Sequence, residues 1–225
     1  LAPVEQLQLP ISKSSGLLWL IASLLLVLTA ILQFRDSSSW PLWAFGAIVI
    51  SQFLILLSWQ DAKWGTIANL IILGAAVVVY SGNRFEKSFL QDVREQLSQA
   101  PSSSELLTIA DVAHLPTPVQ RYLEYAGTIG QPKVHNMVVT FQGRMRSKDQ
   151  DWFHFTSQQF NDFSNPARLF FMKANVKGLP TYGYHAYRNQ QASMRIKILS
   201  LVPVVDLGTE ELFRTETVTF FNDMC

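Results

Sequence analysis

Three apolar runs follow one another in the first part of the sequence, over residues 16–34, 40–59 and 64–82, and none of them contains Asp, Glu, Lys or Arg. Each run is roughly 20 residues long, and at about 1.5 Å per helical residue this matches the roughly 30 Å core of a bilayer. Trp40, Trp59 and Trp64 stand at run ends, where amphipathic rings favour the headgroup level. Buried helices of a soluble protein rarely stay uncharged over such lengths, so residues 1–82 are predicted to form a transmembrane helical region with three spans.

The apolar pattern continues beyond the third run with a different spacing. Apolar residues recur every fourth position and charged residues lie between them, which predicts an amphipathic helix; the apolar positions are Phe85, Phe89, Val93 and Leu97. The polar face carries both charge signs, which favours packing against protein over lying on a membrane. Pro101 and a run of serines then predict a linker, so residues 83–104 are interpreted as a connector helix and linker.

From residue 133 onward the apolar period changes to two, and aromatic and β-branched residues dominate. Strands are predicted over residues 134–146, 152–160, 168–176, 182–188 and 193–199. Consecutive strands with short connections imply an antiparallel meander with one apolar face. That face needs a cover, and the available covers are a helix at residues 118–126 and a helical segment at 210–221. The fold class is therefore α+β, with a β-rich domain over residues 105–225.

The helix at residues 118–126 has strong local signals at both ends. Thr117, Pro118 and Gln120 have the spacing of a capping box with proline in the first turn. Gly127 is placed to end the helix in a left-handed turn. Val119 and Tyr122 fall on the apolar side that is expected to meet the sheet.

Charge and cysteine content exclude several classes of function. The formal net charge is +1 and basic residues form no run, so the sequence carries no electrostatic footprint for nucleic acid. Cys225 is the single cysteine, and no two histidines have metal-ligand spacing, so we expect no structural zinc, no other metal and no thiol redox site. No glycine-rich phosphate loop is present, and we expect no cofactor.

The sequence begins at Leu1 and stops without a helix-ending signal, so we expect a fragment whose last domain is truncated.

The predicted spans contain no ionisable residue, which disfavours a proton-coupled transporter or a charged-ring channel. Asn69 either lines a path or forms interhelical hydrogen bonds, and we favour the second interpretation. The basic residues that flank the spans number three on one side and two on the other, which does not decide the side of the membrane; they are Arg35, Arg84 and Lys87 against Lys13 and Lys63.

Four stretches together resemble an uncharacterised bacterial family of membrane-anchored proteins: residues 61–69 (DAKWGTIAN), 114–122 (HLPTPVQRY), 143–146 (GRMR) and 201–206 (LVPVVD). The resemblance covers nearly the whole chain and implies an architecture and a location in the bacterial cytoplasmic membrane, without catalytic residues. More loosely, the second half is similar to the curved antiparallel half-barrels of lipoprotein carriers, which fold over helices and hold an acyl chain. That similarity is a fold-level analogy.

Three hypotheses of function follow, in order of preference. The first is a membrane-tethered module that binds a lipid or other apolar ligand. It predicts a pocket between the sheet and the helices, lined by Phe155, Phe170 or Met194. Arg144 and Arg195, if they share the other face, are candidates for a phosphate or carboxylate head group. We favour the simpler interpretation, an ordinary solvated face.

The second hypothesis is a structural or interaction protein of the bacterial envelope, with an unknown protein partner. The third is an enzyme, for which His114, His185 and Asp206 are the best available titratable residues. The serines lack the Gly-x-Ser-x-Gly elbow and the histidines are scattered, so we assign no catalytic residue.

Overall fold

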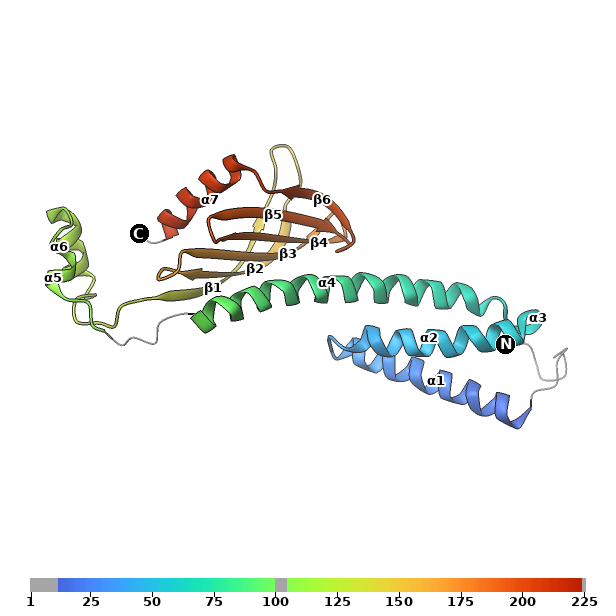
Figure 1. The fold of residues 1–225 in the computed structure, drawn as a ribbon. Helices are drawn as coiled ribbons and strands as arrows, with labels where there is room; N and C mark the ends of the chain where they lie inside the picture. The colour runs from blue at the N-terminus through green and yellow to red at the C-terminus, as the bar shows by residue number, and fades with distance from the viewer. Residues whose placement is uncertain (1–11, 100–104, 224–225) are drawn as a thin grey trace. The chain divides into compact units, whose positions relative to one another are not determined.

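The computed structural model describes residues 12–99 and 105–223. The chain divides into two compact units, one built on Leu1–Lys87 and the other on Ser88–Ile198 with Pro203–Cys225. The first unit is helical and the second carries the sheet (Figure 1). The predicted linker at residues 100–104 lies outside the described residues.

Helices make up most of the described part of the first unit, to which Leu199–Val202 also belongs. They are α1 (Lys13–Phe34), α2 (Trp40–Leu57), α3 (Trp59–Ala62) and the first part of α4 (Gly65–Gln99). The helix α1 begins at Lys13, before the predicted span, because the Ser12 hydroxyl caps it by accepting a hydrogen bond from the Ser15 backbone N–H. The third apolar run and the connector helix form one continuous helix, α4. By length and hydropathy α1, α2 and α4 are long and apolar enough to cross a membrane.

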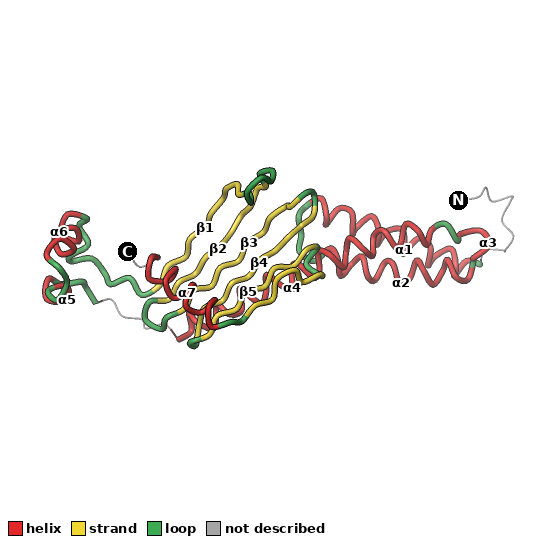
Figure 2. Tube along the Cα trace, turned by 90° about the horizontal axis from the view of Figure 1, so that it is seen from above, coloured by secondary structure: helices red, strands yellow, loops and turns green. Residues whose placement is uncertain are grey.

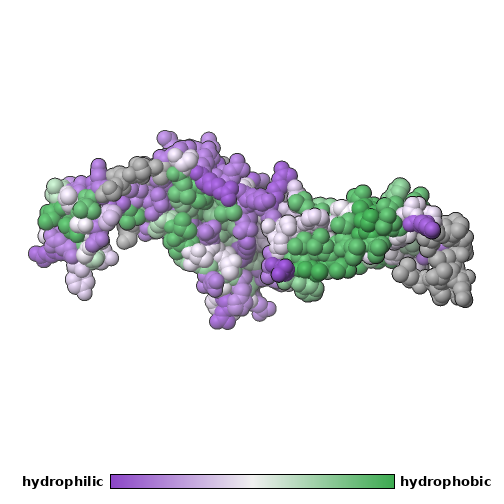
Figure 3. Space-filling view, turned by 90° about the horizontal axis from the view of Figure 1, so that it is seen from below, coloured by the Kyte–Doolittle hydropathy of each residue, from purple (hydrophilic) through white to green (hydrophobic). Residues whose placement is uncertain are grey.

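The outer surface of the first unit is apolar, as Figure 3 shows for one face of its helices. Inside it, Trp40, Ala44, Ile48 and Ala76 form a buried cluster. Asn69 is buried as well, and its amide donates to Gln52 Oε1 at 3.0 Å and lies 3.2 Å from the Ser51 hydroxyl. These bonds join α2 to α4, so the interhelical interpretation of Asn69 is confirmed.

The second unit contains a six-stranded antiparallel sheet whose strands follow one another in sequence order. Figure 2 shows β1 to β5 side by side in this order. Its strands are β1 (Asn136–Met145), β2 (Phe153–Asp162), β3 (Ala167–Val176), β4 (Leu179–Arg188), β5 (Gln191–Ile198) and β6 (Val202–Leu207). The α+β fold class and the five predicted strands are confirmed. The sequence analysis missed β6, because Pro203 within a short apolar run argues against a strand.

The pairing register assigns every strand residue to one of two faces. We call face A the side that carries Phe155, Ser157 and the other odd-numbered residues of β2. Face B is the opposite side, which carries His154 and Phe160. Paired residues of neighbouring strands share a face and form rows across the sheet.

Each face is covered over part of its length by a helix, α7 on face A and residues 88–99 of α4 on face B (Figure 1). The helix α7 (Glu210–Asp223) packs Phe220 against Tyr187 of β4 and Ala192 of β5, which confirms the predicted cover by residues 210–221. On face B, the Phe89 ring lies 5.6 Å from the Phe171 ring and 5.7 Å from the Tyr184 ring, centre to centre.

The helix that was expected to cover the sheet has an exposed apolar side instead. It is α6 (Thr117–Tyr125), which follows the short helix α5 (Ile109–Val112) and contains no buried residue. Val119 is 41% exposed and Tyr122 is 60% exposed. The prediction that their face meets the sheet was wrong, and α4 supplies the second cover.

The capping box also lies elsewhere. Pro116, not Thr117, is the N-cap of α6, and the Gln120 side chain donates to the carbonyls of Ala113 and Leu115. Thr108 and Asp111 form a capping box at α5 instead. The predicted end at Gly127 is confirmed, because its φ is +70° and the Thr128 N–H donates to the Leu123 carbonyl, as in a Schellman motif.

Candidate functional site

Face A is divided into a polar half, where α7 binds, and an apolar half. The polar half contains two cross-strand rows, Val139–Gln159–Phe170–His185–Met194 and Met137–Asn161–Arg168–Tyr187–Ala192. The apolar half lies toward the end of the sheet where β1 stops and β2 begins. We call that end the tip.

In the polar half, the Arg168 guanidinium joins three elements. It donates from Nη1 to Glu216 Oε2 at 2.9 Å, from Nε to Asp223 Oδ2 at 2.9 Å and from Nη2 to Gln159 Oε1 at 3.1 Å. The Gln159 and Asn161 amides donate to the same Asp223 oxygen at 2.8 and 3.1 Å. Because every contact pairs a donor with an acceptor, this network attaches α7 to the sheet as a satisfied polar cluster.

The charge on Glu216 is stabilised within this network. Burial alone raises the pKa of Glu216, but the hydrogen bond from His185 Nδ1, 3.2 Å long, and the charge of Arg168 outweigh burial and hold the pKa below 4.5. Glu216 therefore remains a carboxylate at neutral pH, with one oxygen on Arg168 and the other on His185.

In the tip half of face A, large and small apolar side chains alternate. The rows are Phe141–Ser157–Met172–Gly183–Ile196 and Gly143–Phe155–Ala174–Thr181–Ile198. We call these ten residues the apolar patch. Phe141 is 42% exposed, and Phe155, Met172, Ile196 and Ile198 are all partly exposed. A partly exposed apolar surface of this extent is unusual on a sheet face that helices otherwise cover.

Of the two buried hydroxyl residues in the apolar patch, Thr181 donates to the Leu179 carbonyl and Ser157 has no such partner. Ser157 is 5% exposed, and its hydroxyl finds no hydrogen-bond partner among the described residues. An unsatisfied buried hydroxyl costs free energy, on the order of 1–3 kcal/mol. A ligand with a polar group near one end would remove that cost.

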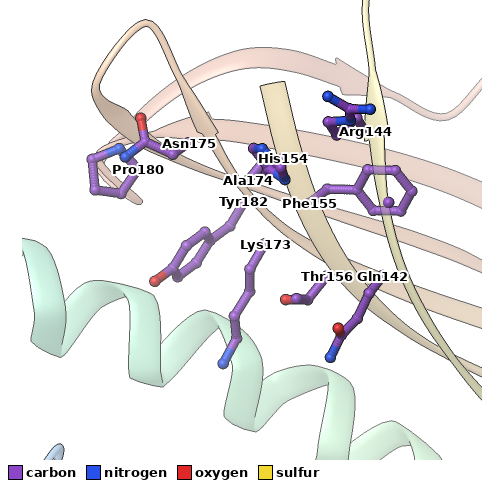
Figure 4. Close-up of a pocket in the computed structure, with 11 residues that line it drawn as sticks. Gln142, Arg144, His154, Phe155, Thr156, Lys173, Ala174, Asn175, Pro180 and Tyr182 are labelled. Atoms are coloured by element: carbon purple, nitrogen blue, oxygen red, sulfur yellow. The ribbon is translucent and has the colours of Figure 1, made fainter. Parts of the chain in front are cut away.

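Face B carries a pocket of about 590 Å³ near the tip, shown in Figure 4. One row of polar side chains forms its floor, and these side chains project to the same side of the sheet: Gln142, Thr156, Lys173 and Tyr182. Arg144, His154, Asn175 and Pro180 complete this face of the pocket. The residues that line the pocket include Arg144 and Lys173 and no carboxylate.

The candidate apolar residues all lie on face A, but in different settings. Phe155 lies in the apolar patch. Phe170 and Met194 share the row next to it, where the Phe170 ring contacts His185 at 5.8 Å and stands 5.5 Å from the Arg168 guanidinium. The structure therefore brings the three residues to one face, with Phe170 and Met194 at the margin of the α7 network.

The two candidate arginines share face B, as the head-group hypothesis requires, but they lie on β1 and β5. Four strand spacings of about 4.8 Å separate these strands by roughly 19 Å. One phosphate cannot contact both side chains. Arg144 lines the pocket of about 590 Å³, whereas Arg195 lies over the Tyr184 ring at 5.8 Å and lines a smaller cavity.

Tyr184 anchors α4 to face B. Its hydroxyl donates to Asp92 Oδ2 at 2.5 Å, and the same carboxylate receives Arg188 Nη2 at 2.9 Å. Burial, followed by the hydrogen bond to Asp92 and the charge of that carboxylate, raises the pKa of Tyr184 well above its ordinary value of 10.0. The phenol therefore stays protonated and keeps donating.

The residues considered for catalysis do not form a cluster. His114 lies between α5 and α6, Asp206 lies on β6, and His185 is bonded to Glu216. His135 Nδ1 and the Ser164 hydroxyl are 2.9 Å apart, but Asp162 Oδ1 accepts the Ser164 N–H and so serves the turn. In residues 12–99 and 105–223, no three His, Cys, Asp or Glu side chains are placed to hold a metal ion.

The partners of Arg168 were not predicted from the sequence. A signal was present in α7, where aromatic and acidic residues alternate at spacings of three and four: Phe213, Glu216, Phe220 and Asp223. Such a stripe lies on one helical face. Acidic residues inside an apolar stripe indicate a buried basic partner.

Comparisons with known proteins give one finding. No curated protein and no solved structure matches the chain. The similarity to lipoprotein-carrier half-barrels and the bacterial origin therefore stay predictions. The model of one protein family, described as a family of unknown function, matches residues 105–225, which hold the sheet with α5, α6 and α7. The chain belongs to this family, DUF6544.

Proposed function

We propose that this protein is a membrane-tethered module that binds a lipid or another apolar ligand on the apolar patch of face A. The observation that carries the proposal is the partial exposure of the patch, with Phe141, Phe155, Met172, Ile196 and Ile198 as its large side chains. Burying such a surface is favourable at about 25 cal/mol per Å². An acyl chain is an apolar ligand that a membrane supplies.

Two further observations support the proposal. The chain has three helices long and apolar enough to span a membrane, which would keep the patch near a lipid source. The orphaned Ser157 hydroxyl would accept or donate a hydrogen bond to a carboxyl or ester group at the ligand's end. From the resemblance of the four quoted stretches, we propose that the membrane is the bacterial cytoplasmic membrane. From the looser similarity to lipoprotein carriers, we propose that the ligand is an acyl chain held on the curved sheet.

The test uses a substitution that fills the patch without disturbing the backbone. A Cβ at Gly183 would meet Ile196 Cγ1 at 3.7 Å and Met172 Cε at 3.9 Å, which are ordinary contacts. Gly183→Ala is therefore the control, and Gly183→Leu covers the middle of the patch. Full-length protein in nanodiscs is treated with a photoreactive fatty acid, and labelled peptides are mapped by mass spectrometry.

We expect the wild type and Gly183→Ala to be labelled on β2, β3 and β5, and Gly183→Leu to lose most of that labelling. Labelling confined to the spans in all three proteins would refute the proposal. Equal labelling of the strands in Gly183→Leu and the control would show that the lipid lies elsewhere on the sheet.

The apolar side of α6 favours a second candidate function, the binding of a partner protein. Val119 and Tyr122 are exposed on this side, and Ile109 of α5 is exposed as well. A photocrosslinking amino acid at Tyr122 tests this candidate against the same amino acid at Glu124, on the polar side. A specific adduct at position 122 alone would support it, and identical patterns at both positions would contradict it.

A further inference from the structure

We infer that the tip of the sheet is a docking surface for the anionic head groups of a lipid bilayer. Two turns form this tip, the β1–β2 turn over residues 146–152 and the β3–β4 turn at Lys177 and Gly178 (Figure 2). Residues of both turns line one cavity of about 500 Å³, so the turns lie next to each other. The inference goes beyond the proposed function, because it concerns the end of the sheet and not the apolar patch.

The geometry of each turn leaves a lysine exposed at the end of the sheet. In the β1–β2 turn, the Gln150 N–H donates to the Ser147 carbonyl at 3.2 Å, which places Lys148 inside the turn. The β3–β4 turn has two central residues, Lys177 and Gly178, with φ values of +52° and +83°, as in a type I′ hairpin. Both lysine side chains are exposed to solvent.

Basic residues outnumber acidic residues at the tip. The acidic ones are Asp149 and Asp151, and four basic residues less two acidic ones give a net charge of +2. Among the described residues, none of the basic side chains has an ion-pair partner. A basic residue near an anionic membrane surface strengthens binding about fivefold. The exposed basic residues are Arg144, Arg146, Lys148 and Lys177.

Trp152 brings two of these basic side chains together beside exposed apolar groups. Its ring centre lies 4.9 Å from the Arg146 guanidinium and 6.0 Å from the Arg144 guanidinium. Stacking on a ring leaves the N–H donors of a guanidinium free for phosphate oxygens. Trp152 is 55% exposed, and the neighbouring Met145 and Leu179 are 40% and 45% exposed. Indole rings favour the head-group level of a bilayer, so the tip combines the two kinds of group that a lipid surface attracts.

A bilayer is also the anionic surface that the tip can reach most easily. The third apolar run ends at Gly82 and the second unit begins at Ser88, and both residues belong to α4. Along a helix this distance is roughly 9 Å. So short a connection keeps the effective concentration of lipid high, and a weak attraction then suffices for docking.

The test follows one end of the sheet at a time in full-length protein. In a Cys225→Ser background, a single cysteine replaces Leu179 at the tip or Gln191, an exposed residue at the opposite end of the sheet. Each cysteine carries a fluorophore. The protein is placed in nanodiscs of phosphatidylcholine, or of equal amounts of phosphatidylcholine and phosphatidylglycerol, that contain a lipid with a nitroxide on its head group. The nitroxide quenches only fluorophores at the membrane surface.

We expect the fluorophore at position 179 to be quenched several-fold more strongly with phosphatidylglycerol than without it, and less strongly at high salt, because salt screens the attraction. The fluorophore at position 191 should show neither effect. The double variant Arg146→Gln with Lys148→Gln should weaken docking roughly 25-fold, which is the product of two single contributions. The control is Arg94→Gln with Arg121→Gln, which removes the same charge from exposed positions outside the tip and should change nothing.

Three results would overturn the inference. The first is no quenching at position 179 in either kind of nanodisc, and the second is quenching there that does not depend on phosphatidylglycerol. The third is an equal loss of quenching in the two double variants. Gly183→Leu changes the apolar patch and leaves the tip unchanged, so it should dock normally. Failure of the apolar-ligand proposal would therefore not be mistaken for failure of this one.

Discussion

Arg168 on β3 and Glu216 on α7 form an ion pair of 2.9 Å in which both side chains are nearly inaccessible to solvent. The pair joins residues that are 48 positions apart in the sequence. Burial makes such a pair costly to break, because removing one partner leaves the other charge without water or a counter-ion. The pair therefore controls whether α7 stays on face A.

We predict that Glu216→Ala loosens α7. Loss of one member of a buried ion pair costs about 3–5 kcal/mol. Hydrogen exchange of the α7 amides, measured by mass spectrometry in nanodiscs, should become faster by a matching factor, while exchange in α6 stays constant. The double variant Arg168→Met with Glu216→Leu should recover much of the protection, and additive losses in the double variant would show that the two residues are not coupled.

The lowered pKa of Glu216 predicts that the attachment of α7 to the sheet depends on pH. The pKa of Glu216 is lowered in the folded protein, so its contribution to stability is complete above 4.5 and is lost as the pH falls through the lower folded value. Exchange of α7 amides, corrected for the intrinsic effect of pH, should rise in acid below pH 4.5. Glu216→Gln should abolish this dependence, and an unchanged profile in that variant would assign the effect to another group.

Tyr184→Phe should loosen the packing of residues 88–99 of α4 on face B. The Tyr184 side chain is 1% exposed, and its hydroxyl bonds a carboxylate, a type of hydrogen bond worth about 1.5–3 kcal/mol. Hydrogen exchange of the backbone amides near Asp92 should become faster when this bond is lost. Tyr122→Phe, on the exposed side of α6, is the control and should change nothing; equal effects of the two substitutions would contradict the prediction.

Gly143→Ala and Gly183→Ala should differ, although both add one methyl group to the same sheet face. The new Cβ at Gly143 would lie 3.1 Å from Phe155 Cε1, so the ring must move, whereas at Gly183 the nearest atom is 3.7 Å away. We expect Gly143→Ala to cost about 1–3 kcal/mol and Gly183→Ala less than 0.5 kcal/mol. Thermal unfolding of the two proteins in the same detergent compares them directly, and equal midpoints would contradict the expectation.

Asn69→Leu should weaken the contact between α2 and α4 by about 1 kcal/mol, which is typical of interhelical hydrogen bonds in membranes. Ser23→Ala is the control, because the Ser23 hydroxyl bonds a carbonyl of its own helix. Thermal unfolding of the two variants in the same detergent measures the loss of stability in each. A loss above about 3 kcal/mol would indicate that Asn69 also organises the helix backbone.

Elements with a regular pattern could be predicted from the sequence, because burial is reflected in the order of apolar and polar residues along the chain. The uncharged spans and the alternation of Met194, Ile196 and Ile198 with Arg195 and Lys197 are such patterns. Once the strand register is known, it follows that Phe155, Phe170 and Met194 lie on the same face of the sheet. The register itself depends on turn geometry, which the sequence left open.

Contacts between distant residues could not be predicted in this way. Thr117 and Gln120 have the spacing of a capping box, but the Pro116 carbonyl accepts the amides of Val119 and Gln120, so the helix begins one residue earlier. The α7 network depends on which strands lie under the helix, and α6 was expected in a place that α4 fills. Local signals place the end of a helix to within a residue or so, whereas the surface on which the helix packs depends on the whole chain.

On face A, the residues that hold α7 and the residues that shape the apolar patch are different residues of the same strands. Attachment of α7 rests on charged and amide side chains such as Arg168 and Gln159, while the size and shape of the apolar patch rest on small residues such as Gly143, Ala174 and Gly183. Substitution at the small positions would change what fits on the surface without touching the charged contacts. Relatives of this chain can thus diversify in what they accommodate while keeping the same scaffold, and sequence variation confined to these few positions would record that history.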